Sequence, residues 1–182
     1  LAREHRLIQR VAAGLVRWAH LVEHRTDDGR LELRRFVGFL RHFVLHSHFA
    51  KETAVALGPA KGLTPCIAGL EEMERGQQAC RRLVNTLHQL ATMHSVWSSS
   101  ERKAVARAAD ELASNLRDVF VVEETIVFPQ LRATLAPSVR VDLHERLVAH
   151  ERLHTGRGEH ERHVSMAEAL AQWSDPSFSP LA

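Results

Sequence analysis

His48 and Glu52 are the residues of this 182-residue chain whose types and spacing most directly suggest chemistry. They lie four positions apart, and on an α-helix that spacing places them on one face, one turn apart. The rest of that face is apolar, with Leu33, Val37, Leu40, Val44 and Val55 at helical spacing. An imidazole and a carboxylate are costly to bury without partners. A metal ion, a hydrogen-bonding network or each other must therefore satisfy them.

Further polar residues lie on the apolar stripes of other predicted helices, namely His5, Gln77 and Glu123. If the helices run antiparallel with short turns, counting residues from the turns brings them to about the height of His48 and Glu52. Two imidazoles and two carboxylates that face one another suit a borderline or hard divalent ion such as iron, manganese or zinc. Carboxylate-bridged metal sites are built in the cores of helix bundles. The candidate metal ligands are therefore His5, His48, Glu52 and Glu123.

The same four residues also allow a reading without metal. Two imidazolium–carboxylate pairs would be balanced in charge and could satisfy each other in the core. Gln77 is expected to donate a hydrogen bond to Glu52 or Glu123, because a buried amide needs such a partner. Glu124, one position round its helix from Glu123, is expected to matter little, and His46 is expected to point away from the apolar stripe.

Long segments with helical period carry these residues. They cover about residues 2–25, 31–57, 64–96 and 98–128. Four long helices joined by short turns predict an all-α fold, an antiparallel up-down-up-down four-helix bundle with an additional C-terminal helical segment. We expect one domain over 1–182, with the core bundle at about 2–128 and the C-terminal segment at about 137–173. Ser98 and Glu101 have the spacing of a capping box at the start of the fourth helix.

Composition excludes several classes of function. Basic residues alternate with acidic ones and the net charge is only +2, so a nucleic-acid-binding surface is not expected. No apolar run is long enough to span a bilayer, so no membrane partner is expected. Cys66 and Cys80 fall on one predicted helix and cannot pair, which favours reduced thiols and a cytoplasmic location. No nucleophile–base pair or phosphate-binding loop is present, and an enzymatic function is not favoured.

Several motifs, taken together and in order, resemble the hemerythrin-like (HHE cation-binding) family over nearly the whole chain. Glu4-His5-Arg6 is similar to the opening Glu-His of the family. The segment from His48 to Glu52 is similar to its His-x-x-x-Glu helix, and the segment from Leu70 to Gln77 looks like its third helix. The segment from Val121 to Pro129 resembles its fourth helix. The resemblance implies a four-helix bundle with non-heme iron held by His5, His48, Glu52 and Glu123.

The chain departs from that family at the imidazole positions. Met73 and Gln77 stand where one or two histidines of the third helix are expected, and Val119 stands where the histidine of the fourth helix is expected. Methionine is a poor ligand for a hard iron site, and valine is not a ligand. One iron ion or none is therefore favoured over a full two-iron centre, and a reversible oxygen carrier is not expected.

Two functions follow from these observations. The first is a hemerythrin-like non-heme iron protein that senses or handles iron, oxygen or nitric oxide through an incomplete site. Its partners would be a metal ion and a small diatomic or apolar ligand. The second is a degenerate bundle that binds no metal and acts as an interaction or small-ligand module. The sequence leaves both open, together with the oligomeric state.

Overall fold

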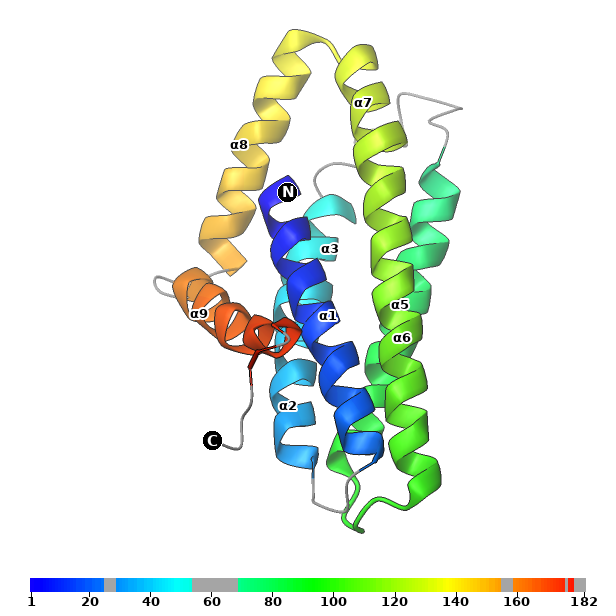
Figure 1. Cartoon of the computed structure of the whole chain (residues 1–182). Helices are drawn as coiled ribbons and strands as arrows, with labels where there is room; N and C mark the ends of the chain where they lie inside the picture. The colour runs from blue at the N-terminus through cyan, green and yellow to red at the C-terminus, as the bar shows by residue number, and fades with distance from the viewer. Residues whose placement is uncertain (25–28, 54–68, 155–158, 176, 179–182) are drawn as a thin grey trace.

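The structure, a computed structural model, describes residues 1–24, 29–53, 69–154, 159–175 and 177–178 (Figure 1). All regular elements in these ranges are helical, as expected from the sequence, and no strand occurs among them. The α-helices are α1 (Ala2–Glu23), α2 (Arg30–Phe39), α3 (Phe49–Lys51), α5 (Leu70–Thr92), α6 (Ser99–Val122), α7 (Phe128–Thr134), α8 (Pro137–His154) and α9 (Glu159–Ala171). The π-helical segments η1 (Leu40–His48) and η3 (Glu123–Val127) and a short 3₁₀ turn, η4 (Gln172–Ser174), join them, and Glu52 and Thr53 are also π-helical.

The helix boundaries follow identifiable signals. Ser98 and Glu101 form the expected capping box, in which the Ser98 amide donates to the Glu101 carboxylate (2.5 Å) and the Glu101 amide donates to the Ser98 hydroxyl (3.3 Å). α5 begins after Gly69, whose φ of 86° is a conformation that glycine adopts without strain. The expected start of this helix at Thr64-Pro65 lies outside the described residues.

One predicted boundary was wrong. The helix that carries Glu123 was expected to end at Phe128-Pro129, but it continues through η3 and α7 to Thr134. The π-helical turn at η3 changes the hydrogen-bonding register just before Pro129. Pro129 then lies in the first turn of α7, a helix position at which proline is tolerated.

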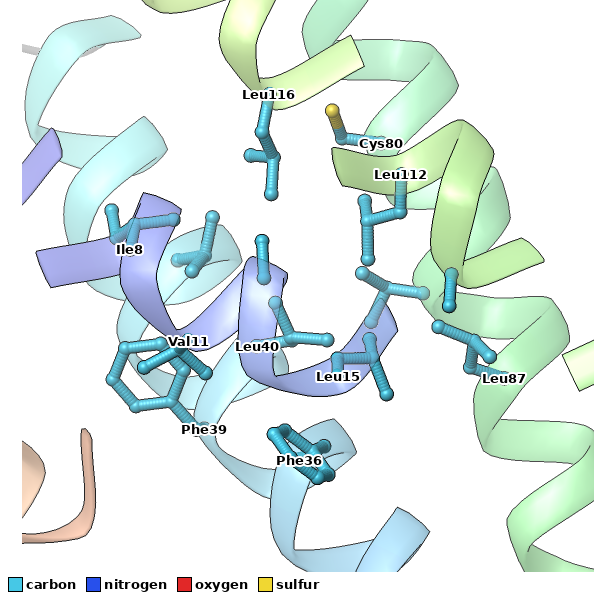
Figure 2. Close-up of a cluster of buried hydrophobic side chains, with 14 of the residues drawn as sticks. Ile8, Val11, Leu15, Phe36, Phe39, Leu40, Cys80, Leu87, Leu112 and Leu116 are labelled. Atoms are coloured by element: carbon cyan, nitrogen blue, oxygen red, sulfur yellow. The ribbon is translucent and has the colours of Figure 1, made fainter. Parts of the chain in front are cut away.

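The long helices pack side by side around one apolar core. α6 packs against α1 and α5, α5 packs against α2, and α9 crosses over α1 and α2. Figure 2 shows side chains from several helices meeting in this core, among them Ile8, Leu15, Phe36, Leu87 and Leu112. The polar candidates lie near the end of this assembly where α1 begins and α6 ends (Figure 1).

Candidate metal centre

The structure brings the four candidate ligands together in one cluster. His5, His48, Glu52 and Glu123 come from α1, η1, the residue after α3 and η3, and each side chain is at most 1 % exposed. Each offers one potential ligand atom, and these atoms all lie within 4.8 Å of one another. The convergence expected from residue counting is therefore present in the structure.

The four inner atoms of the cluster are the Nε2 atoms of the two histidines and one oxygen of each carboxylate. Nε2 of His5 lies 3.5 Å from Oε1 of Glu52 and 3.4 Å from Oε2 of Glu123. Nε2 of His48 lies 3.2 Å from Oε1 of Glu52. All four atoms are buried and have no hydrogen-bond partner. Buried polar atoms normally have a hydrogen-bond partner. Four such atoms that face one another without partners therefore require an explanation.

The outer nitrogen of each imidazole bonds to a further carboxylate. Nδ1 of His5 lies 2.6 Å from Oε1 of Glu124, and Nδ1 of His48 lies 2.7 Å from Oε2 of Glu4. An ionised carboxylate only accepts hydrogen bonds, so each Nδ1 carries the proton. In the neutral imidazole, the lone pair of Nε2 then points into the cluster. This carboxylate–imidazole arrangement is the one that orients histidine ligands in metal sites.

The donor set therefore fits a metal ion. With neutral imidazoles and ionised carboxylates, the inner atoms are two nitrogen and two oxygen acceptors with no hydrogen among them. Acceptors this close together repel one another unless a cation or shared protons lie between them. Two imidazoles and two carboxylates are a ligand set that iron, manganese and zinc accept.

The carboxylates of Glu4 and Glu124, which bond to the outer imidazole nitrogens, form an outer network around the cluster. Lys51 extends this outer network beside His48. Its ammonium lies 2.6 Å from Oε1 of Glu4, and its side chain is only 3 % exposed. Burial alone would raise the pKa of Glu4, but the hydrogen bond and charge of His48, together with Lys51, outweigh it and lower that pKa to about 2. Glu4 is therefore ionised across the physiological range and fixes the tautomer of His48.

Burial shifts the pKa values of the four inner side chains in the direction that favours their neutral forms. Desolvation lowers the pKa of His5 to about 4 and also lowers that of His48. Desolvation, with the nearby charge of Glu123, raises the pKa of Glu52 well above its ordinary value, and desolvation raises that of Glu123 to about 7. Without a cation, the carboxylates hold protons that the imidazoles give up. A divalent ion would displace those protons.

Gln77, on α5, bonds to both carboxylates of the cluster. Its side-chain nitrogen donates to Oε2 of Glu52 at 3.0 Å and to Oε1 of Glu123 at 3.4 Å, so the expected hydrogen bond is confirmed with both carboxylates. Gly76 allows the helix that carries Gln77 to approach α6, because a Cβ atom at this position would collide with the side chain of Val119. Burial raises the pKa of the nearby Cys80 to about 12, so that thiol stays protonated.

Phe120 fixes the two histidine rings from the apolar side. It stacks on His5 with ring centroids 4.1 Å apart and an interplanar angle of 6°. It meets His48 edge-on, with centroids 5.6 Å apart and an angle of 89°. Because one buried ring contacts both imidazoles, their orientations are set together, and the outer carboxylates complete the constraint.

The cluster lies where the helices depart from α-helical geometry. η1 ends at His48, and η3 begins at Glu123. π-helical turns are uncommon and are frequent at functional sites, because the extra residue in the turn redirects side chains that an α-helix would place elsewhere. Here these segments direct one imidazole and one carboxylate into the core.

The structure also places residues that sequence reasoning judged differently or missed. Glu124, expected to matter little, bonds to His5 although its side chain is 45 % exposed. Glu4 and Lys51 belong to the network and were not among the candidates. The signal for Glu4 and Glu124 was the second nitrogen of each buried imidazole, which needs an acceptor. His46 is exposed, as expected, and Met73 and Val119 are buried.

Comparison with known proteins identifies no relative. No model of a known protein family, no curated protein and no solved structure matches the chain. Within the described part of the chain, no helix combines the length and apolar character needed to cross a bilayer.

Proposed function

We propose that this protein binds a divalent metal ion through His5, His48, Glu52 and Glu123. The observation that carries the proposal is the set of four buried inner atoms that face one another without hydrogen-bond partners, within 4.8 Å. Nε2 of each histidine is turned inward because its Nδ1 is engaged by an outer carboxylate. Two ionised carboxylates would balance the charge of one divalent ion in a pocket that excludes water.

Iron is the ion that we favour, and a hemerythrin-like role is the finer proposal. The nitrogen–oxygen donor set accepts Fe²⁺, and iron is the metal that the sequence resemblance implies. On this proposal the long helices form an up-down-up-down four-helix bundle. The protein handles or senses iron, oxygen or nitric oxide at this metal centre, and Phe120 packs against both histidine ligands.

One observation favours a second candidate, a metal-free core. Burial raises the pKa values of Glu52 and Glu123 and lowers those of His5 and His48. Protonated carboxyl groups could donate to the imidazole Nε2 atoms, and all four groups would then be neutral. The protein would in that case be an interaction or small-ligand module with a polar core.

Metal analysis of protein purified without a histidine tag distinguishes the two candidates. The protein is loaded anaerobically with Fe²⁺, separated from free metal and measured for bound metal and thermal stability. We expect bound iron at near-stoichiometric level and a raised melting temperature, because an ion that binds only the folded state stabilises it by mass action.

Two matched histidine variants serve as site and control. His48→Ala removes an inner ligand and should abolish both the bound iron and the thermal shift. His46→Ala removes an exposed imidazole two positions away and should leave both unchanged. A wild-type protein that retains no metal, or a His48→Ala variant that retains as much as wild type, would contradict the proposal and favour the metal-free core.

A further inference from the structure

We propose that Gln77 restricts the cluster to a single metal ion, because its amide occupies the position that a second ion would need. This inference rests on the proposed metal-binding function and specifies its stoichiometry. It makes Gln77 a specificity-determining residue that touches both carboxylate ligands without itself being a ligand.

The two oxygens of each carboxylate face different neighbours. Oε1 of Glu52 and Oε2 of Glu123 face the imidazole nitrogens, and neither has a hydrogen-bond partner. Their other oxygens, Oε2 of Glu52 and Oε1 of Glu123, both accept from the side-chain nitrogen of Gln77, at 3.0 and 3.4 Å. One amide group therefore spans the outer sides of both carboxylates.

A site for two ions would use the same oxygens differently. Bridging carboxylates give one oxygen to each ion, and the ions of such sites lie about 3.5–4 Å apart. Here the oxygens that would reach a second ion already bond to an amide nitrogen, which has two hydrogens to donate and no lone pair to offer. The second position is thus filled by a neutral donor in place of a cation.

The amide cannot turn to serve as a ligand without loss. Gln77 is 4 % exposed, so its amide exchanges no hydrogen bonds with bulk water. The reverse orientation would place its carbonyl oxygen against two carboxylate oxygens, which puts three acceptors together. The observed orientation keeps each carboxylate able to give one oxygen to a metal.

Charge gives a second, independent reason for one ion. Glu52 and Glu123 together balance one divalent cation. Glu4 is already paired with Lys51. A second divalent ion would add two positive charges to a pocket whose ligands are at most 1 % exposed, and a buried charge without compensation is strongly unfavourable.

Manganese provides a test with a readout that does not depend on activity. Full-length wild-type protein is titrated with Mn²⁺, and the number of bound ions per chain is measured by metal analysis. Electron paramagnetic resonance separates one isolated Mn²⁺ from two coupled ions. We expect one isolated ion. Gln77→Glu, which replaces the amide by a carboxylate of the same size, should raise the stoichiometry to two ions with a coupled signal.

Gln78→Glu is the matched control. It makes the same change in charge one position along α5, on an exposed side chain, and should leave the stoichiometry at one. If Gln77→Glu does not fold, Gln77→Asp supplies the same negative charge on a shorter side chain and should also bind two ions.

The outcomes separate this inference from the proposed function. Two ions bound to wild type, or a single isolated ion in a folded Gln77→Glu or Gln77→Asp variant, would overturn the role of Gln77 and leave the metal site standing. No Mn²⁺ and no Fe²⁺ bound to wild type would overturn both.

Discussion

The two ends of the packed helices differ in the side chains that they bury, which are apolar at one end and ionisable at the other. At the end where α1 meets α2, which we call the apolar end, Trp18, Val22 and Trp97 close around Gly29, where a Cβ atom would lie 3.0 to 3.2 Å from their side chains. Trp18 also packs on Phe36, with ring centroids 5.7 Å apart. The one polar atom of Trp97 is satisfied, since its Nε1 donates to the carbonyl of Leu90 at 2.9 Å.

At the opposite end, which we call the cluster end, four ionisable side chains are buried with inner atoms that have no hydrogen-bond partner. The helices there include the π-helical segments η1 and η3, whereas the apolar end is built from regular α-helix. An apolar core of the same volume would be at least as stable as a buried ionic cluster. The difference between the ends therefore supports the proposal that the cluster end binds a metal ion, whereas the apolar end contributes stability.

The largest expected effect tests the apolar end. Phe36→Ala should lower the free energy of unfolding by about 3–5 kcal/mol, because it removes a fully buried ring and leaves a cavity. Urea denaturation measures the change. Leu31→Ala on the same helix, where the side chain is 72 % exposed, should cost little. The metal stoichiometry of folded Phe36→Ala should equal that of wild type, and a lower value would show that the two ends are not independent.

The next effect tests the outer network of the cluster end. Lys51→Met should lower the free energy of unfolding by about 3 kcal/mol, because it leaves Glu4 without its buried ammonium partner. This value is at the low end for a buried pair, since Glu4 keeps its bond to His48 and is 13 % exposed. Lys103→Met removes an exposed lysine and is the control. Equal melting temperatures for the two variants would show that the Lys51–Glu4 pair does not support this end.

The pH dependence of stability should change sign between metal-free and metal-loaded protein. In the metal-free protein, the raised pKa values of Glu52 and Glu123 stabilise the folded state below their ordinary value of 4.5, and this stabilisation is lost as the pH rises through their folded values, about 7 for Glu123. The lowered pKa of His5 has the opposite effect, because it makes the stability rise with pH between about 4 and 6.5. The lowered pKa of His48 also makes the stability rise with pH.

The carboxylates and the imidazoles make opposite contributions to the pH dependence of stability, and these nearly cancel at about pH 4.5 to 6.5. The carboxylates hold about as many protons in the folded state as the imidazoles release. Above pH 6.5 only the carboxylates still differ between the folded and unfolded states. The free energy of unfolding of the metal-free protein should then fall by up to about 1.4 kcal/mol per pH unit for each proton held. With metal bound, the same carboxylates are already ionised, and stability should rise with pH as metal competes better with protons. Urea denaturation from pH 5 to 8.5, with and without metal, measures both slopes, and equal slopes would argue against metal at this cluster.

The sequence predicted the inner cluster because its members share a simple signal. His5, His48, Glu52, Gln77 and Glu123 each interrupt an apolar stripe, and helix lengths set their heights. The all-helical fold followed from the same periodicity. The structure leaves the up-down-up-down order, the single domain and the resemblance to the hemerythrin-like family as predictions.

The outer network was not predictable in the same way. Glu124 is adjacent to Glu123 and faces partly toward solvent, so the helical period assigns it to the surface. It reaches His5 at a π-helical turn, and no pattern in the sequence of this helix indicates such a turn. The π-helical turn also explains why the helix continues beyond Pro129, since proline normally indicates a helix end but here lies in the first turn of α7.

The smallest expected effect compares the two halves of the outer network. Glu124→Gln should weaken metal binding by about tenfold or less, at the low end of the 10–100-fold range for partners of metal-ligating histidines. The glutamine carbonyl can still accept from Nδ1 of His5, and Glu124 is 45 % exposed, so water screens its charge and can take its place. Isothermal titration with Mn²⁺ measures the change, and Glu111→Gln on the exposed face of α6 is the control.

Glu4→Gln should weaken binding more, because Glu4 is 13 % exposed and ionised by His48 and Lys51. A larger loss for Glu124→Gln than for Glu4→Gln would mean that His5, and not His48, is the histidine whose orientation limits the site.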